Sequence, residues 1–226
     1  MARIARVVAP GKPHYIIQRG NRDQKTFFSD EDYQAYRDLL AEWCRSSGVA
    51  VWAYCLLPEQ VHLVAAPEDG ESLRRGVGEA HRRYTRLINA RKGWRGHLWQ
   101  ERFASCPLDE GYALEAVRFV ETLPVRQGLV KKARKYPWSS VAAHLGEGKD
   151  PLVHPSPVVE RVEKWGAFLK EPLPPAVVEK LLLHSRTGRP LGEPTFLKAL
   201  EAELDRPLLP RKPGPRGKKP EPDAEA

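Results

Sequence analysis

Apolar and polar residues follow two different periods along the first half of the chain, and these periods predict an ordered series of strands and helices. Short runs rich in β-branched and aromatic residues predict strands. They lie at residues 14–21, 49–57, 61–66 and 96–108. Residues 58–60 are a short link between the second and third runs, which predicts a β-hairpin.

Apolar positions recur at helical spacing between these strands. The predicted helices lie at residues 29–48, 72–92 and 109–123, with Ser29 as an N-cap and Pro124 just beyond the end of the third. The element order βαββαβα predicts an α+β fold, a ferredoxin-like antiparallel sheet with helices packed on one face.

The character of the chain changes after about residue 145. Glycine and proline become frequent, and short helices are predicted at residues 158–169, 176–184 and 193–204. Residues 206–226 are rich in Pro, Gly, Lys and Arg and cannot bury enough apolar surface to fold. We therefore expect a domain at residues 1–145, a helical extension at 146–205 and a disordered basic tail at 206–226.

Charge and cysteine content narrow the class of protein. The 226 residues carry a formal net charge of +8, which favours a polyanionic partner such as nucleic acid or an anionic membrane surface. Six basic and three acidic residues in 206–226 give that tail +3, so most of the excess, +5, lies in residues 1–205. The three cysteines form no CxxC pair, and no run of about 18 apolar residues occurs. We expect a cytoplasmic protein without a membrane segment.

The hairpin carries a candidate metal site. Gln60 and His62 are two residues apart in a predicted strand, so their side chains point to the same face. Two histidines at this spacing could bind a divalent metal, but an amide oxygen is a weaker ligand than imidazole. A single histidine hydrogen-bonded on the sheet explains the pattern equally well.

Several motifs in order identify a family resemblance. The segment Trp52-Ala-Tyr-Cys-Leu-Leu-Pro-Glu-Gln-Val-His-Leu-Val64 resembles the His-hydrophobic-His region of REP-associated tyrosine transposases, which are single-tyrosine relatives of the HUH-type insertion-sequence transposases. Further matching motifs begin at Gln18, Ala80, Gly96, Pro124 and Tyr136. The resemblance covers about residues 1–145, and it assigns the positive charge to nucleic-acid binding.

The resemblance implies a reaction whose key residues are substituted here. In such enzymes two histidines and a polar side chain hold a metal while a tyrosine attacks a DNA phosphate. The first histidine position is Gln60, the nucleophile position is Phe119 and the third ligand position is Leu123, so only His62 remains. Because Phe119 and Leu123 are spaced i, i+4 on one helix face, we expect them to form an apolar patch there. Tyr112, two helical turns before Phe119, is the candidate for a displaced nucleophile.

The positions that the resemblance associates with DNA binding are largely retained. Three arginines of the predicted second helix, Arg75, Arg82 and Arg86, are expected on its solvent face, and aromatic stacking on an unpaired base is possible at His97 and Trp99, with a core position favoured for Trp99. The full set of candidate DNA contacts is Arg19, Asn21, Arg22, Arg75, Arg82, Arg83, Arg86, Arg95, His97 and Arg102.

These observations predict a DNA-binding descendant of a transposase that recognises hairpin or single-stranded palindromic DNA without cutting it. We expect no cofactor, and Mg²⁺ or Mn²⁺ only if residual activity exists. One alternative is an active, metal-dependent DNA-nicking transposase with an atypical site. Another is an RNA-binding or protein-interaction module. The sequence does not determine the oligomeric state.

Overall fold

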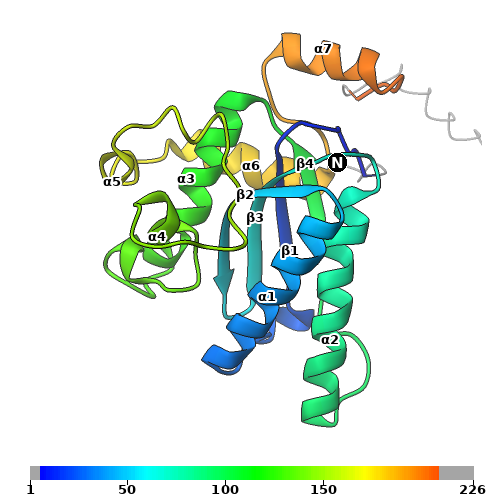
Figure 1. Cartoon of the computed structure of the whole chain (residues 1–226). Helices are drawn as coiled ribbons and strands as arrows, with labels where there is room; N and C mark the ends of the chain where they lie inside the picture. Colours follow the sequence, from blue (N-terminus) through cyan, green and yellow to red (C-terminus); the bar gives the residue numbers. More distant parts are fainter. Residues whose placement is uncertain (1–5, 209–226) are drawn as a thin grey trace, which may run out of the picture.

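A four-stranded antiparallel sheet is the centre of the fold (Figure 1). The computed structural model describes residues 6–208, so most of the tail predicted to be disordered, from residue 209 onward, lies outside the described residues. The strands are β1 (His14–Arg19), β2 (Val49–Leu57), β3 (Gln60–Pro67) and β4 (Ala104–Pro107). Their spatial order is β2-β3-β1-β4, which is the ferredoxin-like arrangement predicted from the element order.

The predicted hairpin is confirmed, with one irregularity. Leu57 pairs with Gln60 across the turn, but the register shifts where Val51 faces Ala65 and Ala53 faces Val64, which leaves Trp52 as the extra residue of a β-bulge. The bulge changes which residues face each side of the sheet. Val51 packs on one side, whereas Trp52 and Ala53 both pack on the other.

Two helices cover the face of the sheet that lies towards the viewer in Figure 1. They are α1 (Asp30–Ser46) and α2 (Glu79–Lys92), and their buried aromatic and aliphatic residues form one core cluster with the sheet. The predicted second helix begins with a π-helical turn at Arg74–Gly78, in which a Cβ on Gly76 would lie 3.1 Å from a Val49 methyl carbon. A Cβ at this position would crowd β2 and α1, so glycine favours the close approach of this turn to both elements.

Helices also cover the opposite face of the sheet, beyond the single layer predicted from the sequence. The longer of these helices is α3 (Glu110–Arg126), and α6 (Pro175–Thr187) packs against α3, β1 and β4. A second core cluster lies between these helices and the sheet. The cause is the composition of β2 and β3, in which nearly every residue is buried on one face or the other.

Several predicted boundaries are wrong in detail. The strand expected at 96–108 is regular only in β4, because Leu98 and Trp99 turn into the α1–α2 core. Helix α3 continues past its expected end and contains Pro124 near its C-terminus, where the proline ring removes one intrahelical N–H donor. The helix predicted at 158–169 is reduced to α5 (Trp165–Phe168).

The remaining helices are short. They are α4 (Val141–His144) and α7 (Pro194–Glu203), with 3₁₀ turns at Asn21–Asp23 and Ala133–Lys135. Of the other two helices predicted after residue 145, α7 matches closely and α6 extends three residues further than predicted.

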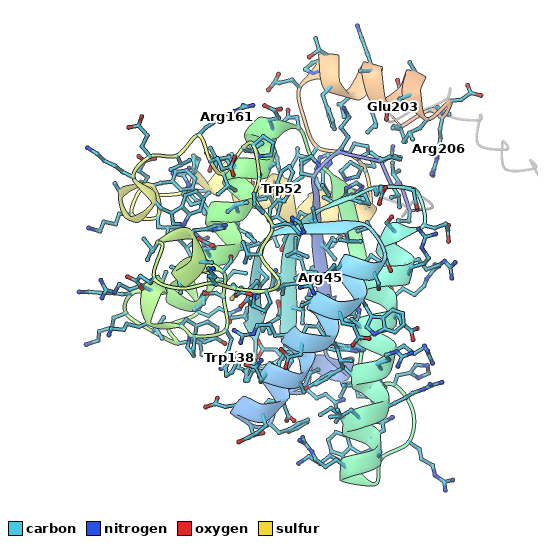
Figure 2. The ribbon with its side chains drawn as sticks, viewed as in Figure 1. Arg45, Trp52, Trp138, Arg161, Glu203 and Arg206 are labelled. Carbon is cyan, nitrogen blue, oxygen red and sulfur yellow. The ribbon has the colours of Figure 1, made fainter. Side chains whose placement is uncertain are left out.

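Irregular segments protect both edges of the sheet. The backbone N–H of Leu56 donates to the carbonyl of Trp138 at 2.9 Å, and the backbone N–H of His154 donates to the carbonyl of Val51 at 2.7 Å. Strand β2 is therefore not a free edge. Trp138 lies beside α1 in Figure 2 and stacks on Tyr33 with ring centroids 4.9 Å apart. On the far edge, Leu191 bridges to Leu108 immediately after β4. Within residues 6–208, no helix has the length and apolar character needed to cross a membrane.

His14 and His81 are buried in the fold, as is His62, and burial favours the neutral form of each ring. Burial lowers the pKa of His14 to about 4 and the pKa of His81 to about 3. His81 Nε2 lies 2.7 Å from the Tyr36 hydroxyl, which links α2 to α1. The rings of His14 and His81 are therefore uncharged in the folded protein at neutral pH.

The buried histidines predict a loss of stability in mild acid. Below the ordinary histidine pKa of 6.5, each of these histidines is protonated in the unfolded chain but stays neutral in the folded chain. As the pH is lowered, the free energy of unfolding should therefore fall by about 1 kcal/mol per pH unit for each histidine. Urea denaturation at pH values between 7 and 5 measures this slope. His81→Gln should reduce it, whereas the same change at the exposed His97 should leave it as in the wild type. An equal slope in His81→Gln would contradict the assignment.

Candidate functional site

The hairpin residues Gln60 and His62 meet Tyr15 of β1 on the sheet face that α3 covers. The Tyr15 hydroxyl lies 2.8 Å from His62 Nδ1, and His62 Nε2 lies 3.0 Å from Gln60 Oε1. The shared face of Gln60 and His62 predicted from their spacing is thus confirmed. Tyr15 is placed diagonally to His62, since His62 pairs with Ile17 and Tyr15 pairs with Val64.

These two hydrogen bonds define the state of the His62 ring. An amide oxygen can only accept, so Nε2 carries the proton and donates it to Gln60, while Nδ1 accepts from the Tyr15 hydroxyl. The side chain is 2% exposed. Burial, with a smaller contribution from the positive charge of Arg19, lowers the pKa of His62 to about 3. His62 is therefore a neutral ring with both nitrogens engaged.

Helix α3 closes this cluster with apolar side chains. Phe119 is 3% exposed and meets the rings of Tyr15 and His62 nearly edge-on, with centroids 6.0 and 6.4 Å away. Leu123, one turn later and 6% exposed, belongs to the same core cluster. The apolar patch predicted from the i, i+4 spacing of Phe119 and Leu123 is thus present, and together with Tyr15, Gln60 and His62 it forms what we call the closed cluster.

The closed cluster does not fit a divalent metal. His62 has no free lone pair at Nε2, Gln60 offers an amide oxygen already used as an acceptor, and Leu123 has no donor atom. Among residues 6–208, no three His, Cys, Asp or Glu side chains are grouped so that they could hold an ion. The donor set that the reaction chemistry requires is missing at this position.

Tyr112, the candidate for a displaced nucleophile, lies near the first turn of α3 in a different setting. Its hydroxyl accepts a hydrogen bond of 2.9 Å from the Lys180 ammonium of α6, and the same ammonium lies 5.6 Å from the centre of its ring. This hydrogen bond raises the pKa of Lys180. Lys180 therefore stays protonated as a donor and cannot act as the base that a tyrosine nucleophile needs.

Three of the candidate DNA-contacting arginines are already paired with acids. Arg75 forms an ion pair of 2.5 Å with Asp69. Arg82 and Arg83 share the carboxylate of Glu79, and the Arg83 guanidinium also lies over the Trp43 ring at 4.3 Å. The solvent face of α2 is consequently less positive than its arginine count indicates.

The other candidate arginines lie around the end of β1 and the far end of α2. Arg22 is exposed in a turn that holds it and Asp23 at φ values of 54°, a left-handed conformation that is costly for these residues. Asn21 donates its backbone N–H to the carbonyl of Leu98, and His97 is exposed next to it. No ion pair within residues 6–208 involves Arg19, Arg22, Arg86, Arg95 or Arg102.

Trp99, the candidate for stacking on a base, is 7% exposed and lies in the core position that the sequence favoured rather than on the surface.

The structure also reveals residues that sequence reasoning missed. Tyr15 sits two positions before Ile17, which pairs with His62, so Tyr15 lies on the same sheet face as His62 and strand periodicity was the available signal. Arg126 lies over the Phe119 ring at 5.7 Å. Arg186 of α6 shares a hollow of about 320 Å³ with Arg19 and Arg102, and no sequence signal connects residues so far apart in the chain.

Comparison with known proteins places this geometry in a family. The profile of the family described as "Transposase IS200 like" matches residues 9–122, about half of the chain. No curated protein matches. A solved REP-associated tyrosine transposase bound to a REP hairpin is similar at 20% identity with a TM-score of 0.52, covering 70% of this chain and 93% of its own.

A second solved structure, a protein from Deinococcus radiodurans described as a candidate transposase, is 21% identical with a TM-score of 0.37 and covers 54% of this chain and 97% of its own. At 20% identity, the structure of the REP-associated tyrosine transposase establishes likeness of fold alone. The family profile runs from before β1 into α3 and ends one residue before Leu123, so it includes the other four residues of the closed cluster. The chain belongs to the family of IS200-like transposases.

Proposed function

We propose that this protein binds hairpin or single-stranded DNA and does not cleave it. The observation that carries the proposal is the closed cluster, in which a phenylalanine and a leucine pack where the family reaction needs a nucleophile and a metal ligand. A covalent phosphotyrosine link requires a tyrosine oxygen, and Phe119 has none.

Unpaired positive charge supports the binding half of the proposal. Arg19, Arg22 and Arg102 gather near the end of β1, while Arg86 and Arg95 lie towards the end of α2, and each can neutralise a phosphate. The likeness in fold to a transposase that was solved on a REP hairpin supports hairpin DNA as the ligand. The strained turn at Arg22 supports it too, because costly backbone conformations are often kept where a side chain must meet a ligand.

The state of His62 supports the absence of a catalytic metal. A metal would have to displace the Gln60 amide from Nε2 and strip the proton from that nitrogen, in a site that is buried and lacks a second imidazole. We therefore propose that neither Mg²⁺ nor Mn²⁺ is a cofactor.

The proposal predicts DNA binding without a cleaved or covalently linked product. Labelled hairpin DNA and single-stranded DNA, incubated with millimolar Mg²⁺ or Mn²⁺ and run on denaturing gels, should migrate unchanged, while electrophoretic mobility shifts under native conditions should show a complex. The physical reason is that no nucleophilic oxygen and no complete ligand set remain in the closed cluster.

Two variants make the gel result decisive. Cleavage by the wild type that His62→Ala abolishes would establish an active transposase with an atypical site. Cleavage that Tyr112→Phe abolishes would assign the nucleophile to Tyr112. Equal affinity for unrelated RNA of the same length would instead favour general electrostatic binding over recognition of DNA.

The closed cluster also predicts how the protein responds to metal. The Tm of the wild type should be unchanged by millimolar Mn²⁺ or Zn²⁺, because every donor in the cluster is engaged. Gln60→His places a second imidazole on the same strand face, and bound metal should then raise the Tm by about 3 °C. Differential scanning fluorimetry with and without EDTA measures both. A metal-dependent rise in the wild type would overturn this part of the proposal.

A further inference from the structure

A hollow of about 320 Å³ brings together three arginines from three separate parts of the chain. Arg19 comes from the end of β1, Arg102 from the segment before β4, and Arg186 from the last turn of α6. We propose that this hollow, which we call the arginine hollow, holds a backbone phosphate of the bound DNA. The inference rests on the proposed function and deepens it, since it gives the C-terminal helical extension a part in binding.

The electrostatics of the arginine hollow favour an anion. Its lining residues include three arginines and one acidic residue, Glu101, and within residues 6–208 none of the three arginines forms an ion pair. Like charges gathered in one concave place repel one another, and a bound anion relieves that repulsion. Guanidinium groups present paired N–H donors that match two oxygens of a phosphate.

The backbone around the arginine hollow fixes its walls. The N–H of Gln100 donates to the carbonyl of Arg19 at 3.0 Å, and the Gln18 side-chain amide donates to the carbonyl of Glu101 at 2.9 Å. These bonds tie the segment before β4 to the end of β1. Helix α6 packs against both strands, so Arg186 approaches from a rigid element.

The arginine hollow lies next to the closed cluster. Arg19 is paired in register with Gln60, and Ile17, which also lines the hollow, is paired with His62. The charge of Arg19 reaches the cluster, because it lowers the pKa of His62. A strand of DNA held at Arg19 would therefore pass beside the position where the family reaction takes place.

The volume limits what can enter. A hollow of about 320 Å³ is at the lower end of the range for ligand pockets, so it suits one phosphate with its sugar and is too small for a duplex. In single-stranded DNA beside a hairpin, a single phosphate with its sugar can enter such a hollow without a paired strand. We therefore assign the arginine hollow to a single-stranded flank of the DNA rather than to its paired stem.

The decisive residue is Arg186, because it belongs to the extension and lies outside the matched family segment. Arg186→Ala should weaken the binding of a hairpin with a single-stranded flank about fivefold at 0.15 M salt and lower the slope of log K against log salt by about 0.7. Arg186→Lys should retain most of the slope. Fluorescence anisotropy over a salt series measures both quantities.

Arg45→Ala is the matched control, since it removes the same charge from an exposed position on α1, in the helical layer on the other side of the sheet (Figure 2). It should bind as the wild type does. A set of DNAs, each with one phosphate of the flank replaced by a neutral methylphosphonate, adds a second readout. At one position in the flank, the methylphosphonate should weaken DNA binding by the wild type. The same substitution should not weaken DNA binding by Arg186→Ala any further.

The outcomes separate the two proposals. If the wild type binds DNA and Arg186→Ala shows the same affinity and slope, or loses no more than Arg45→Ala, the arginine hollow is not a phosphate site and the proposed function stands. If the wild type binds neither hairpin nor single-stranded DNA, the proposed function and this inference both fail.

Discussion

The sheet is apolar on both faces, and this constraint organises the rest of the structure. Leu63 and Val64 are adjacent in β3, are both fully buried, and belong to different core clusters. A sheet with two such faces needs a helical layer on each side. Helices α1 and α2 supply one layer, and α3 with α6 supplies the other. The closed cluster exists because α3 must lie directly on β1 and β3.

Sequence reasoning could predict what depends on local pattern. The hairpin, the shared face of Gln60 and His62, and the apolar patch of Phe119 and Leu123 all follow from residue spacing in one strand or one helix. The ferredoxin-like order followed from the alternation of elements. These features were predictable because they involve neighbours within a few residues, where periodicity reports the contact.

Features that depend on distant contacts could not be predicted in this way. The bulge at Trp52 changes the face of one residue within a continuous apolar run, and such a run gives no alternation from which to read it. The second helical layer was missed although α3 and α6 were both predicted as helices, because periodicity within a helix does not tell which face of the sheet the helix covers. The partner of His62 is Tyr15, 47 residues earlier, and the meeting of Arg186 with Arg19 likewise requires the tertiary fold.

The arginine hollow proposed for binding and the closed cluster consist of different residues at adjoining places in this fold, so the proposed binding does not depend on the chemistry of the family reaction. The chemistry needs buried donors aimed at a metal, and here those positions are filled by side chains that pack or pair with one another. Neutral packed groups avoid the cost of holding unpaired ligands away from water. The arginines remain at the solvent side, where hydration supports their charge without a partner. Arg19 stands at the boundary, because its strand pairs with Gln60 while its side chain lines the arginine hollow. A phosphate at Arg19 would offset the charge that helps to lower the pKa of His62, yet burial, the larger cause, would still keep that ring neutral.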